Sequence, residues 1–522
     1  MARVLITEPL PDTAVSVLVA AGHDVRVEIG LSPEDLAGHL GGVEAIIVRS
    51  ATQLTAAVLE AARQLRVVGR AGTGVDNIDL HAASAHGVLV LNAAGANSVS
   101  MAEHTMALML AVARHVPQAD ASVRAGLWER SRFQGVELDG MTLGVLGLGA
   151  TGSLVAKRAQ AFGMRVVAWD PWMGPARAAQ LGVELVEVDD LFTEADFVSV
   201  HLNRTPDTLG LVGERLLALA KPGLRLVNCA RGGIVDEAAL SAALVSGRVA
   251  GAALDVFDHE PPTGSPVLDL AEVVLTPHLG GSTAQAQDRL AVVVTTQVVT
   301  ALAGGLPHGA VNLPVPTPGD RTVPLIPLAE RLGRLLGGLC SIIPERVEAI
   351  YQGQPPLEDT AALTLAAVKG ILGDATVEPP VSYVNAMAVA AERGMTVVDQ
   401  RSTEPCDHTV LITLSGGDHR VAGTVMGSGQ EPRVVSIDNH DLELPLARHM
   451  LVVRNDDRVG MMAVVTSAVA TAGVNIADMR VGRSPTGGTA LAVLATDQPV
   501  PDATIDEMRH HVGILDACTV EV

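Results

Sequence analysis

A glycine-rich segment between a predicted strand and a predicted helix constrains the fold of this chain more than any other feature. Gly147-Leu148-Gly149-Ala150-Thr151-Gly152 follows the apolar run 143–146 and opens a helical pattern over 153–162. The G-x-G-x-x-G spacing is weak evidence alone, but a strand before it and a helix after it are the context of dinucleotide binding. The first glycine permits a tight turn, the second lets a pyrophosphate approach the backbone, and the third packs the helix on the strand. We therefore expect a parallel sheet whose dinucleotide contacts are Gly147, Gly149, Ala150, Thr151 and Gly152.

An acidic residue stands where such a fold contacts the ribose. Asp170 ends the next apolar run, 166–169, about 20 residues after the glycines. A carboxylate there accepts a hydrogen bond from the ribose 2′-hydroxyl and repels a 2′-phosphate, so NAD is predicted in preference to NADP. The alternative role for Asp170 is a strand-end cap before Pro171.

Short apolar runs alternate with helical patterns on both sides of the fingerprint. The expected strands are 3–7, 24–28, 45–48, 66–69 and 88–91 before it, and 142–146, 165–169, 197–201, 224–227, 251–256 and 273–275 in the second series. This order predicts an α/β fold with two Rossmann-like, doubly wound parallel-sheet domains. A helical pattern over 282–303 would return the chain to the first sheet. We therefore expect a discontinuous first domain, 1–97 and 283–312, around a dinucleotide-binding domain of residues 98–282.

The last third of the chain contains two further units. Proline- and glycine-rich segments over 303–307 and 314–320 are typical of a linker. Residues 321–447 show helical and strand patterns without a chemical motif, and we expect an α+β intervening domain there. From residue 448 to 522 the order is strand, helix, strand, strand, helix, strand, with Pro485-Thr486-Gly487-Gly488 as the hairpin turn. That order predicts a ferredoxin-like βαββαβ domain.

The composition disfavours several classes of function. The 522-residue chain has a net charge of −22, which argues against nonspecific nucleic-acid binding. Its four cysteines are widely spaced without a C-x-x-C pair, so no metal site is predicted. No apolar run reaches the roughly 18 residues of a membrane span, and the first residues form a strand pattern rather than a signal peptide. We expect a cytoplasmic protein with free thiols and no membrane contact.

Three chemically different residues follow strand-like runs in the second series. Arg231, Glu260 and His278 lie just beyond the runs 224–227, 254–257 and 273–275. In a parallel sheet, residues past the carboxyl ends of the strands face the ligand crevice. There an imidazole can take a hydroxyl proton, a carboxylate can favour the charged imidazole, and an arginine can grip a carboxylate. Each residue alone is more often a loop contact, but together they are suited to oxidising an alcohol next to a carboxylate.

The chain resembles the D-isomer-specific 2-hydroxyacid dehydrogenases, in the long D-3-phosphoglycerate dehydrogenase form with intervening and ACT domains. The resemblance covers essentially the whole length and is strongest in Gly69-Arg70-Ala71-Gly72-Thr73-Gly74-Val75-Asp76-Asn77-Ile78-Asp79, in the fingerprint and in the three catalytic segments. It implies NAD-dependent oxidation of 3-phospho-D-glycerate to 3-phosphohydroxypyruvate, the first step of L-serine biosynthesis. It also implies a homotetramer, with L-serine as a feedback effector.

The resemblance assigns roles to residues by position. Arg231 would bind the carboxylate and the C2 oxygen, Glu260 would support His278, and His278 would be the general base. The remaining residues implied at the active site are Asp255 for the cofactor and Arg49, Ser50, Gly72, Thr73 and Gly74 for the substrate. Arg130 and Arg132 resemble residues near a neighbouring subunit's active site, although solvated surface charge is the alternative.

The resemblance also implies an effector site in the C-terminal domain. Asp457 and Asn475 match positions that bind the amino and carboxyl groups of serine across a dimer interface, although Asp457 alone could be a simple loop acid. The family often has Pro where Val459 stands and Gly where Ala463 stands. We therefore expect weakened serine inhibition.

Two further departures concern the active site. Ala150 replaces a common Arg in the fingerprint, and Met141 replaces a common Lys. Both remove a positive charge, and we expect changes in affinity rather than loss of chemistry because the catalytic residues are intact.

Two other functions stay open from the sequence. The same chemistry could reduce hydroxypyruvate, glyoxylate or another 2-oxo acid, or the fold could serve as an NAD-sensing binding protein or corepressor. The long apolar helix after Ser98 suits a dimer interface and a buried core helix equally well.

Overall fold

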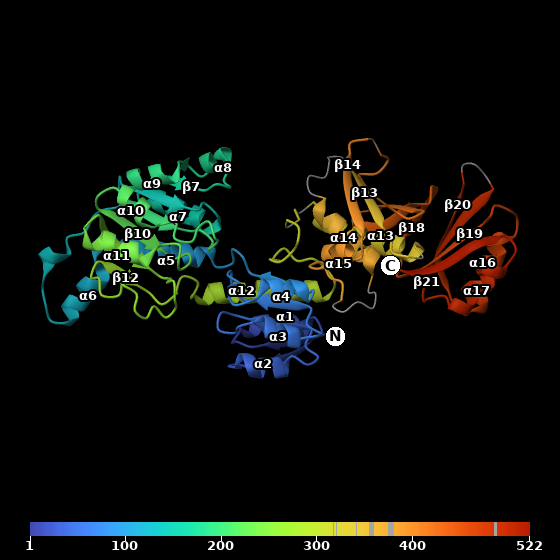
Figure 1. The fold of residues 1–522 in the computed structure, drawn as a ribbon, viewed down its shortest axis with the longest axis horizontal. Coiled ribbons are helices and arrows are strands. Elements are labelled where there is room, and N and C mark those ends of the chain that lie inside the picture. The colour runs from blue at the N-terminus through green and yellow to red at the C-terminus, as the bar shows by residue number, and fades with distance from the viewer. Residues whose placement is uncertain are drawn as a thin grey trace.

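The computed structural model describes residues 1–522 except 317, 320, 341, 354–359, 374–379, 405, 428 and 485–487. The described strands form four separate sheets. Figure 1 shows the second sheet along the chain at one end of the molecule and the fourth at the other, with the first and third between them. Most of the predicted hairpin turn at Pro485-Thr486-Gly487-Gly488, and residues 317 and 320 of the predicted linker, lie outside the described residues.

The first sheet is parallel, with the strand order β2-β1-β3-β4-β5. Its strands are β1 (Arg3–Ile6), β2 (Asp24–Val27), β3 (Ala45–Val48), β4 (Val67–Arg70) and β5 (Leu89–Asn92). Its helices are α1 (Asp12–Ala20), α2 (Pro33–His39), α3 (Ala56–Ala61), α4 (Leu80–Ala85) and α12 (Ala284–Leu302). The last of these comes from far along the chain and packs against α1, β3, β4 and β5. We call this unit the first-sheet domain.

The second sheet is also parallel, in the order β8-β7-β6-β9-β10-β11-β12. Its strands are β6 (Thr142–Leu146), β7 (Arg165–Trp169), β8 (Glu184–Leu185), β9 (Phe197–Val200), β10 (Leu224–Asn228), β11 (Val249–Leu254) and β12 (Val273–Leu275). Its helical elements are α5 (Ser98–Arg114), α6 (Val116–Arg124), η1 (Arg130–Phe133), α7 (Ala150–Ala161), α8 (Pro175–Gln180), α9 (Val188–Glu194), α10 (Glu214–Leu219) and α11 (Glu237–Val245). The order reverses at β6, the switch point where open α/β sheets bind ligands. We call this unit the second-sheet domain.

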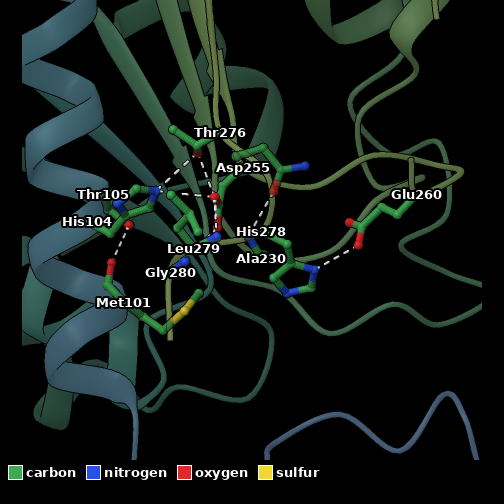
Figure 2. A network of polar contacts seen from close by, with 11 residues as sticks. Met101, His104, Thr105, Ala230, Asp255, Glu260, Thr276, His278, Leu279 and Gly280 are labelled. Atoms are coloured by element: carbon green, nitrogen blue, oxygen red, sulfur yellow. Dashed lines mark hydrogen bonds and ion pairs between the residues drawn. The ribbon is translucent and has the colours of Figure 1, made fainter. Parts of the chain in front are cut away.

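Helix α5 belongs to the core of the second-sheet domain. It packs against α7, β10, β11 and β12, and Ala102, Met109 and Ala113 on it are buried with Val145 of β6 in one apolar cluster. The buried-core alternative for this helix is therefore what the structure shows. The helix also brings its amino-terminal half to the edge where the strands of this sheet end, which places it beside the candidate site (Figure 2).

The third sheet is mixed, in the order β14-β13-β15-β16-β17-β18, with β13 and β14 parallel and the other pairs antiparallel. Its strands are β13 (Arg346–Gly353), β14 (Thr396–Ser402), β15 (Val410–Gly416), β16 (His419–Met426), β17 (Glu431–Ile437) and β18 (His440–Pro445). Its helical elements are η2 (Val323–Leu325), α13 (Ile326–Leu339), α14 (Ala361–Leu372) and α15 (Ala386–Glu392). Packing of α13 on both this sheet and β22 joins this unit to the last one.

The fourth sheet is antiparallel, in the order β20-β21-β19-β22. Its elements are β19 (His449–Asp456), α16 (Met461–Thr471), β20 (Ile476–Arg483), β21 (Thr489–Thr496), α17 (Asp502–His510) and β22 (Ile514–Glu521). This is the predicted βαββαβ order, so the predicted fold class is confirmed for all four units. Among the residues that the structure describes, no helix is both long and apolar enough to cross a membrane.

Candidate active site

Arg231, Glu260 and His278 lie at the same edge of the second sheet. They follow the neighbouring parallel strands β10, β11 and β12, which end at Asn228, Leu254 and Leu275. The run expected as a strand over 251–256 is wrong at its carboxyl end, because β11 stops at Leu254, the last residue of its register with both neighbours. The chain then leaves the sheet as the loop that carries Glu260.

His278 and Glu260 form the predicted pair. Nδ1 of His278 lies 2.9 Å from Oε2 of Glu260 (Figure 2). The other carboxylate oxygen of Glu260 accepts a hydrogen bond from the backbone N–H of Phe257, at 3.2 Å. The pair is partly exposed, with 48% and 39% of the two side chains accessible. Because Nδ1 faces the carboxylate, Nε2 is the ring nitrogen that remains for a substrate proton.

The backbone of His278 is held in an uncommon conformation. Its φ is +54°, in the left-handed region, which costs a residue with a Cβ about 1 kcal/mol or more unless its surroundings fix it. The backbone N–H of His278 donates to the carbonyl of Asp255 at 2.9 Å. The next two amides, of Leu279 and Gly280, donate to the Asp255 carboxylate at 2.7 and 2.8 Å. The loop is therefore built around Asp255.

Asp255 is fully buried, with 0% of its surface exposed. Burial raises its pKa, but hydrogen bonds from His104, Thr276, Leu279 and Gly280 outweigh burial and hold the pKa of the carboxyl below its usual value. The carboxylate is thus ionised inside the protein and satisfied by its own chain. Its predicted contact with the cofactor stays a prediction.

Arg231 reaches across to the first-sheet domain. Its guanidinium lies 3.7 Å from the exposed carboxylate of Asp76. A Cβ built on Gly74 would lie 2.7 Å from the Nη2 of Arg231, so the predicted substrate loop and this arginine are in direct contact. The structure therefore brings Arg231 and Gly74 together from different domains, as an active site between two domains requires.

Two further arginines lie in the same cluster. The charges of Arg231 and Arg49 both act on Arg70, and burial followed by the charge of Arg231 lowers the Arg70 pKa. Nε of Arg70 is buried without a hydrogen-bond partner among the described residues. Glu8 and Asp76 compensate only part of this positive charge. Three cations and an unpartnered buried donor are typical of an anion site.

Gln287 and Arg70 were missed from the sequence. Gln287 accepts a hydrogen bond from Arg49 and donates to the carbonyl of Gly281 at 2.9 Å. It thereby links the cation at the end of β3 to the loop of His278. The sequence did contain a pattern that could have identified Arg70. This residue ends a strand of the first sheet, much as Asp170 directly follows a strand of the second sheet.

The other predicted substrate residues surround this cluster. Gly72 is buried under Arg70, whose guanidinium occupies the space that a Cβ at position 72 would need. The Thr73 hydroxyl donates to Asn97 at 3.1 Å, which ties the substrate loop to the start of α5. Ser50 is exposed. These residues line the same region as Arg49 and Arg231, and their contacts with a substrate stay a prediction.

The fingerprint residues fit a dinucleotide. Gly147 has φ +91°, and a Cβ on Gly152 would lie 2.0 Å from the carbonyl oxygen of Gly147, so both glycines are required by the turn itself. By contrast, a Cβ on Gly149 would meet nothing within 4 Å. Gly149 precedes α7, whose first residues Ala150 and Thr151 present backbone N–H groups at its positive end. That open space is where a pyrophosphate approaches in this fold.

Asp170 lies beside this turn. Its carboxylate accepts hydrogen bonds from the backbone N–H groups of Leu148 and Trp172 at 2.8 and 2.9 Å. The side chain is half-buried, and its oxygens retain lone pairs for a ribose hydroxyl. The local-cap alternative is thus realised, and it also fixes the carboxylate next to the fingerprint.

The two predicted effector residues lie at opposite ends of α16. Asp457 precedes the helix and lies 3.3 Å from Arg483, whereas Asn475 follows it and donates to Asp497 at 2.7 Å. A helix of 11 residues spans about 16 Å, which is too long for one free amino acid to bridge. Val459 and Ala463 are both exposed near the Asp457 end. One chain therefore does not bring the two effector residues together.

Arg130 and Arg132 lie in η1, and both are exposed. Arg132 pairs with Glu129 at 3.1 Å, and both are exposed. Within one chain this is the surface-charge alternative, since a neighbouring subunit would be needed to bring these residues to an active site.

Three families match successive parts of the chain. Residues 106–280 match the D-isomer specific 2-hydroxyacid dehydrogenase, NAD binding domain. Residues 321–438 match the D-3-phosphoglycerate dehydrogenase intervening domain, and residues 449–509 match the ACT domain.

Relatives and solved structures agree with these matches. The D-3-phosphoglycerate dehydrogenase of Mycobacterium tuberculosis is 43% identical over 99% of this chain and 98% of its own. That of Archaeoglobus fulgidus is 40% identical over 100% of both chains. A crystal structure of a Thermus thermophilus protein is 37% identical, with a TM-score of 0.55 over 59% of this chain and 99% of its own. A glyoxylate reductase from Paecilomyes thermophila is 27% identical, with a TM-score of 0.54 over 58% of this chain and 95% of its own. The chain therefore belongs to the D-3-phosphoglycerate dehydrogenase family, in its long form with intervening and ACT domains, within the D-isomer specific 2-hydroxyacid dehydrogenases.

Proposed function

We propose that this protein oxidises 3-phospho-D-glycerate to 3-phosphohydroxypyruvate with NAD, as the first step of L-serine biosynthesis. The observation that carries the proposal is the cluster of Arg49, Arg70 and Arg231 in the same site as the His278–Glu260 pair. A substrate with a carboxylate and a phosphate has two anionic ends, and three cations suit both of them. Relatives that align over essentially the whole chain and are named D-3-phosphoglycerate dehydrogenase support the same activity.

In the proposed reaction His278 accepts the C2 hydroxyl proton through Nε2, since Nδ1 is held by Glu260. Glu260 stabilises the positive charge that develops on the imidazole. Arg231 binds the carboxylate and the C2 oxygen, which keeps the hydroxyl oriented toward His278. The turn 147–152 and Asp170 would hold NAD, which would supply the acceptor for the C2 hydride. In the reverse direction the protonated imidazole returns its proton to the new alcohol.

The activity is tested by following NADH absorbance with 3-phosphoglycerate and, in reverse, with phosphorylated and unphosphorylated 2-oxo acids. Turnover of 3-phosphoglycerate supports the proposal. Reduction of hydroxypyruvate or glyoxylate alone would favour the second candidate function, a 2-oxo acid reductase, which the likeness to a glyoxylate reductase makes worth testing. Absence of turnover with every substrate, despite NADH binding, would favour an NAD-sensing protein.

Arg49→Met is expected to separate the two ends of the substrate. Because Arg49 is assigned to the phosphate, its loss should raise KM for 3-phosphohydroxypyruvate by roughly 10- to 100-fold, the value of a charge-assisted hydrogen bond. KM for hydroxypyruvate, which lacks the phosphate, should change less than threefold. Arg26→Met, on the exposed edge strand β2, is the matched control. Equal effects of Arg49→Met on both substrates would contradict the assignment.

We also propose that the ACT domain binds an amino acid effector, L-serine, between two chains of a cytoplasmic homotetramer. The separation of Asp457 and Asn475 by α16 supports a site shared by two chains. Widely spaced, free cysteines support the cytoplasmic location.

Asn475→Ala in the full-length protein is expected to weaken serine binding by roughly 10- to 100-fold, because an amide-to-carboxylate hydrogen bond is lost. Calorimetry with serine measures the dissociation constant of each variant. Asp502→Ala, at the exposed start of α17, is the control. Inhibition of the wild-type enzyme should be weak, since Val459 and Ala463, both exposed near Asp457, stand where the family often has Pro and Gly. Unchanged binding in Asn475→Ala would remove this residue from the effector site.

A further inference from the structure

His104 on α5 reaches into the loop that carries His278. Its Nε2 lies 3.2 Å from Oδ1 of Asp255 and 3.2 Å from the hydroxyl of Thr276 (Figure 2). Only 19% of the side chain is exposed, and the Asp255 side chain beside it is completely buried. Nothing in the proposed reaction uses this imidazole, and it stands on a helix that belongs to the core.

The hydrogen bonds around Asp255 determine which ring nitrogen carries a proton. The single hydroxyl hydrogen of Thr276 is directed to Oδ1 of Asp255, at 2.6 Å. The Thr276 oxygen can then only accept from His104. Since the carboxylate also only accepts, Nε2 of His104 must be protonated and must donate to both groups. His104 is therefore a donor in this network whatever the charge of its ring.

The network connects directly to the catalytic imidazole. Oδ1 of Asp255 accepts hydrogen bonds from His104, from the Thr276 hydroxyl and from the backbone N–H of Leu279, and Oδ2 accepts one from the backbone N–H of Gly280. The carbonyl of the same aspartate holds the N–H of His278. A rotation of the Asp255 carboxylate would release the amides that follow His278, and its left-handed backbone would lose the contacts that maintain it.

Helix α5 and the loop are in close contact beyond this hydrogen bond. A Cβ on Gly280 would lie 2.5 Å from the sulfur of Met101, one turn before His104. The hydroxyls of Ser100 and Thr283 are 2.7 Å apart. The helix thus supports both ends of the loop, and His104 is the point at which it contacts the charged centre.

We propose that His104 is a positioning residue for the reaction, which fixes the Asp255 carboxylate and through it the reactive orientation of His278. This inference rests on the proposed function only in that His278 must be the base. His104 contacts Asp255 and Thr276 and is not among the residues assigned to the substrate, so its loss should lower kcat rather than change the affinity for the substrate.

Among the described residues, the titratable groups next to Asp255 include His104 from α5 and Cys229, which follows β10 and whose pKa burial raises to about 12. His278, in the same loop as Asp255, contacts it through its backbone N–H. Cys229 is therefore a neutral thiol over the working pH range. Glu103, the neighbour of His104 on α5, is exposed and pairs with Arg158 of α7 at 3.6 Å, on a different side of the helix.

The sign of the pH effect follows from the Asp255 network. Four donors hold the Asp255 pKa below its usual value, and His104 is the first of them. Removal of this donor raises the Asp255 pKa, so the carboxylate is protonated at a higher pH. The loop geometry that needs the ionised carboxylate is then lost earlier as the pH falls, and the acid limb of the kcat profile moves upward.

The experiment compares His104→Leu, which keeps the bulk but removes the donor, with His104→Gln, whose amide nitrogen is the same number of bonds from the backbone as Nε2. The Leu variant is expected to show kcat lowered by roughly 5- to 30-fold, with KM changed less than twofold and the acid limb moved upward. The Gln variant should retain kcat within about threefold and a wild-type profile. Hydrogen exchange of the free proteins supplies a readout without turnover, with the Leu279 and Gly280 amides exchanging faster only in the Leu variant.

Several outcomes would overturn the inference. Native kcat, pH profile and exchange in His104→Leu would show that the imidazole only fills space. Equal losses in the Leu and Gln variants would show that the ring shape, not the donor, is required. If His104→Leu does not fold, His104→Asn replaces it, because the shorter amide does not reach Asp255. All variants are assayed with the substrate that the wild-type enzyme turns over. Failure of wild type on 3-phosphoglycerate therefore rejects the proposed function, and only a difference among the variants bears on His104.

Discussion

Replacing His278 by alanine is expected to lower kcat by roughly 10²–10⁴-fold, the usual contribution of a positioned acid or base. The loss should appear in both directions, because the same imidazole accepts the proton in oxidation and returns it in reduction. The carboxylate of its partner Glu260 lies 2.9 Å from Nδ1 of His278, whereas the proton is transferred through Nε2. Glu260 is therefore not oriented to take over the transfer. NADH binding should survive, because the fingerprint turn and Asp170 follow other strands of the sheet, β6 and β7.

The measurement is steady-state turnover together with a fluorescence titration of NADH. His308→Ala, at an exposed position outside the site, is the matched control and should retain wild-type turnover. Alanine and histidine both carry a Cβ, so the backbone conformation with φ +54° at position 278 is similarly strained for either residue. The free energy of unfolding should therefore change by less than about 1 kcal/mol. Near-native turnover in His278→Ala would exclude His278 as the base.

The His278–Glu260 pair and the fingerprint turn could be predicted because each depends on local order along the chain. A polar residue directly after an apolar strand lies at the carboxyl edge of a parallel sheet wherever that strand is placed. The fingerprint needs only a strand, a tight turn and a helix in succession, and the structure shows β6, Gly147 and α7 in that order.

Other site residues could not be identified because their role depends on packing between distant segments. His104 lies in the middle of a helix and is 151 positions from Asp255, and Gln287 is 238 positions from Arg49. Neither residue type marks a site by itself. Their function follows from the way α5 and α12 cross the ends of other strands, which hydrophobic periodicity does not specify.

Strand ends were predicted less well than strands, for a physical reason. The first strand of the βαββαβ order predicted from residue 448 is β19, which continues to Asp456 through Arg454 and Asn455. Apolarity ends at Val453, but backbone pairing with β21 persists to the last residue of the strand. Pairing between strands needs backbone partners rather than apolar side chains. The hydrophobic pattern therefore does not predict the polar end of a strand that pairs with a strand on each side.

Arg231→Met is expected to lower kcat/KM by roughly 10²–10³-fold, since removal of one partner of a desolvated charge pair costs about 2–5 kcal/mol. Arg231 is the cation that touches the substrate loop at Gly74, and it is assigned to the carboxylate and the reacting oxygen. Unlike Arg49→Met, this change should affect phosphorylated and unphosphorylated substrates alike, because both carry the carboxylate.

The same variant should not be less stable than the wild-type protein. The charge of Arg231 helps to lower the Arg70 pKa, so its removal relieves repulsion between two arginines in the free enzyme. Among the residues that the structure describes, the acidic partner that loses a contact is Asp76, whose side chain is 73% exposed, and exposed pairs contribute little. Arg231→Met should therefore combine low activity with an unchanged or higher Tm, as expected where a binding site concentrates like charges for a ligand.

Arg231→Lys and Arg204→Met complete the test. Lysine keeps the charge but not the planar fork, so it should recover only part of kcat/KM. Arg204, in the same domain, is exposed and lies 3.4 Å from Asp258, so its replacement by methionine should leave activity unchanged within about twofold. A kcat/KM of Arg231→Met within threefold of wild type, or a loss confined to the phosphorylated substrate, would contradict the assignment. In the second case Arg231 would be the phosphate contact, and the carboxylate would have to be bound by Arg70, whose unpartnered Nε is the remaining buried donor among the described residues of the cluster.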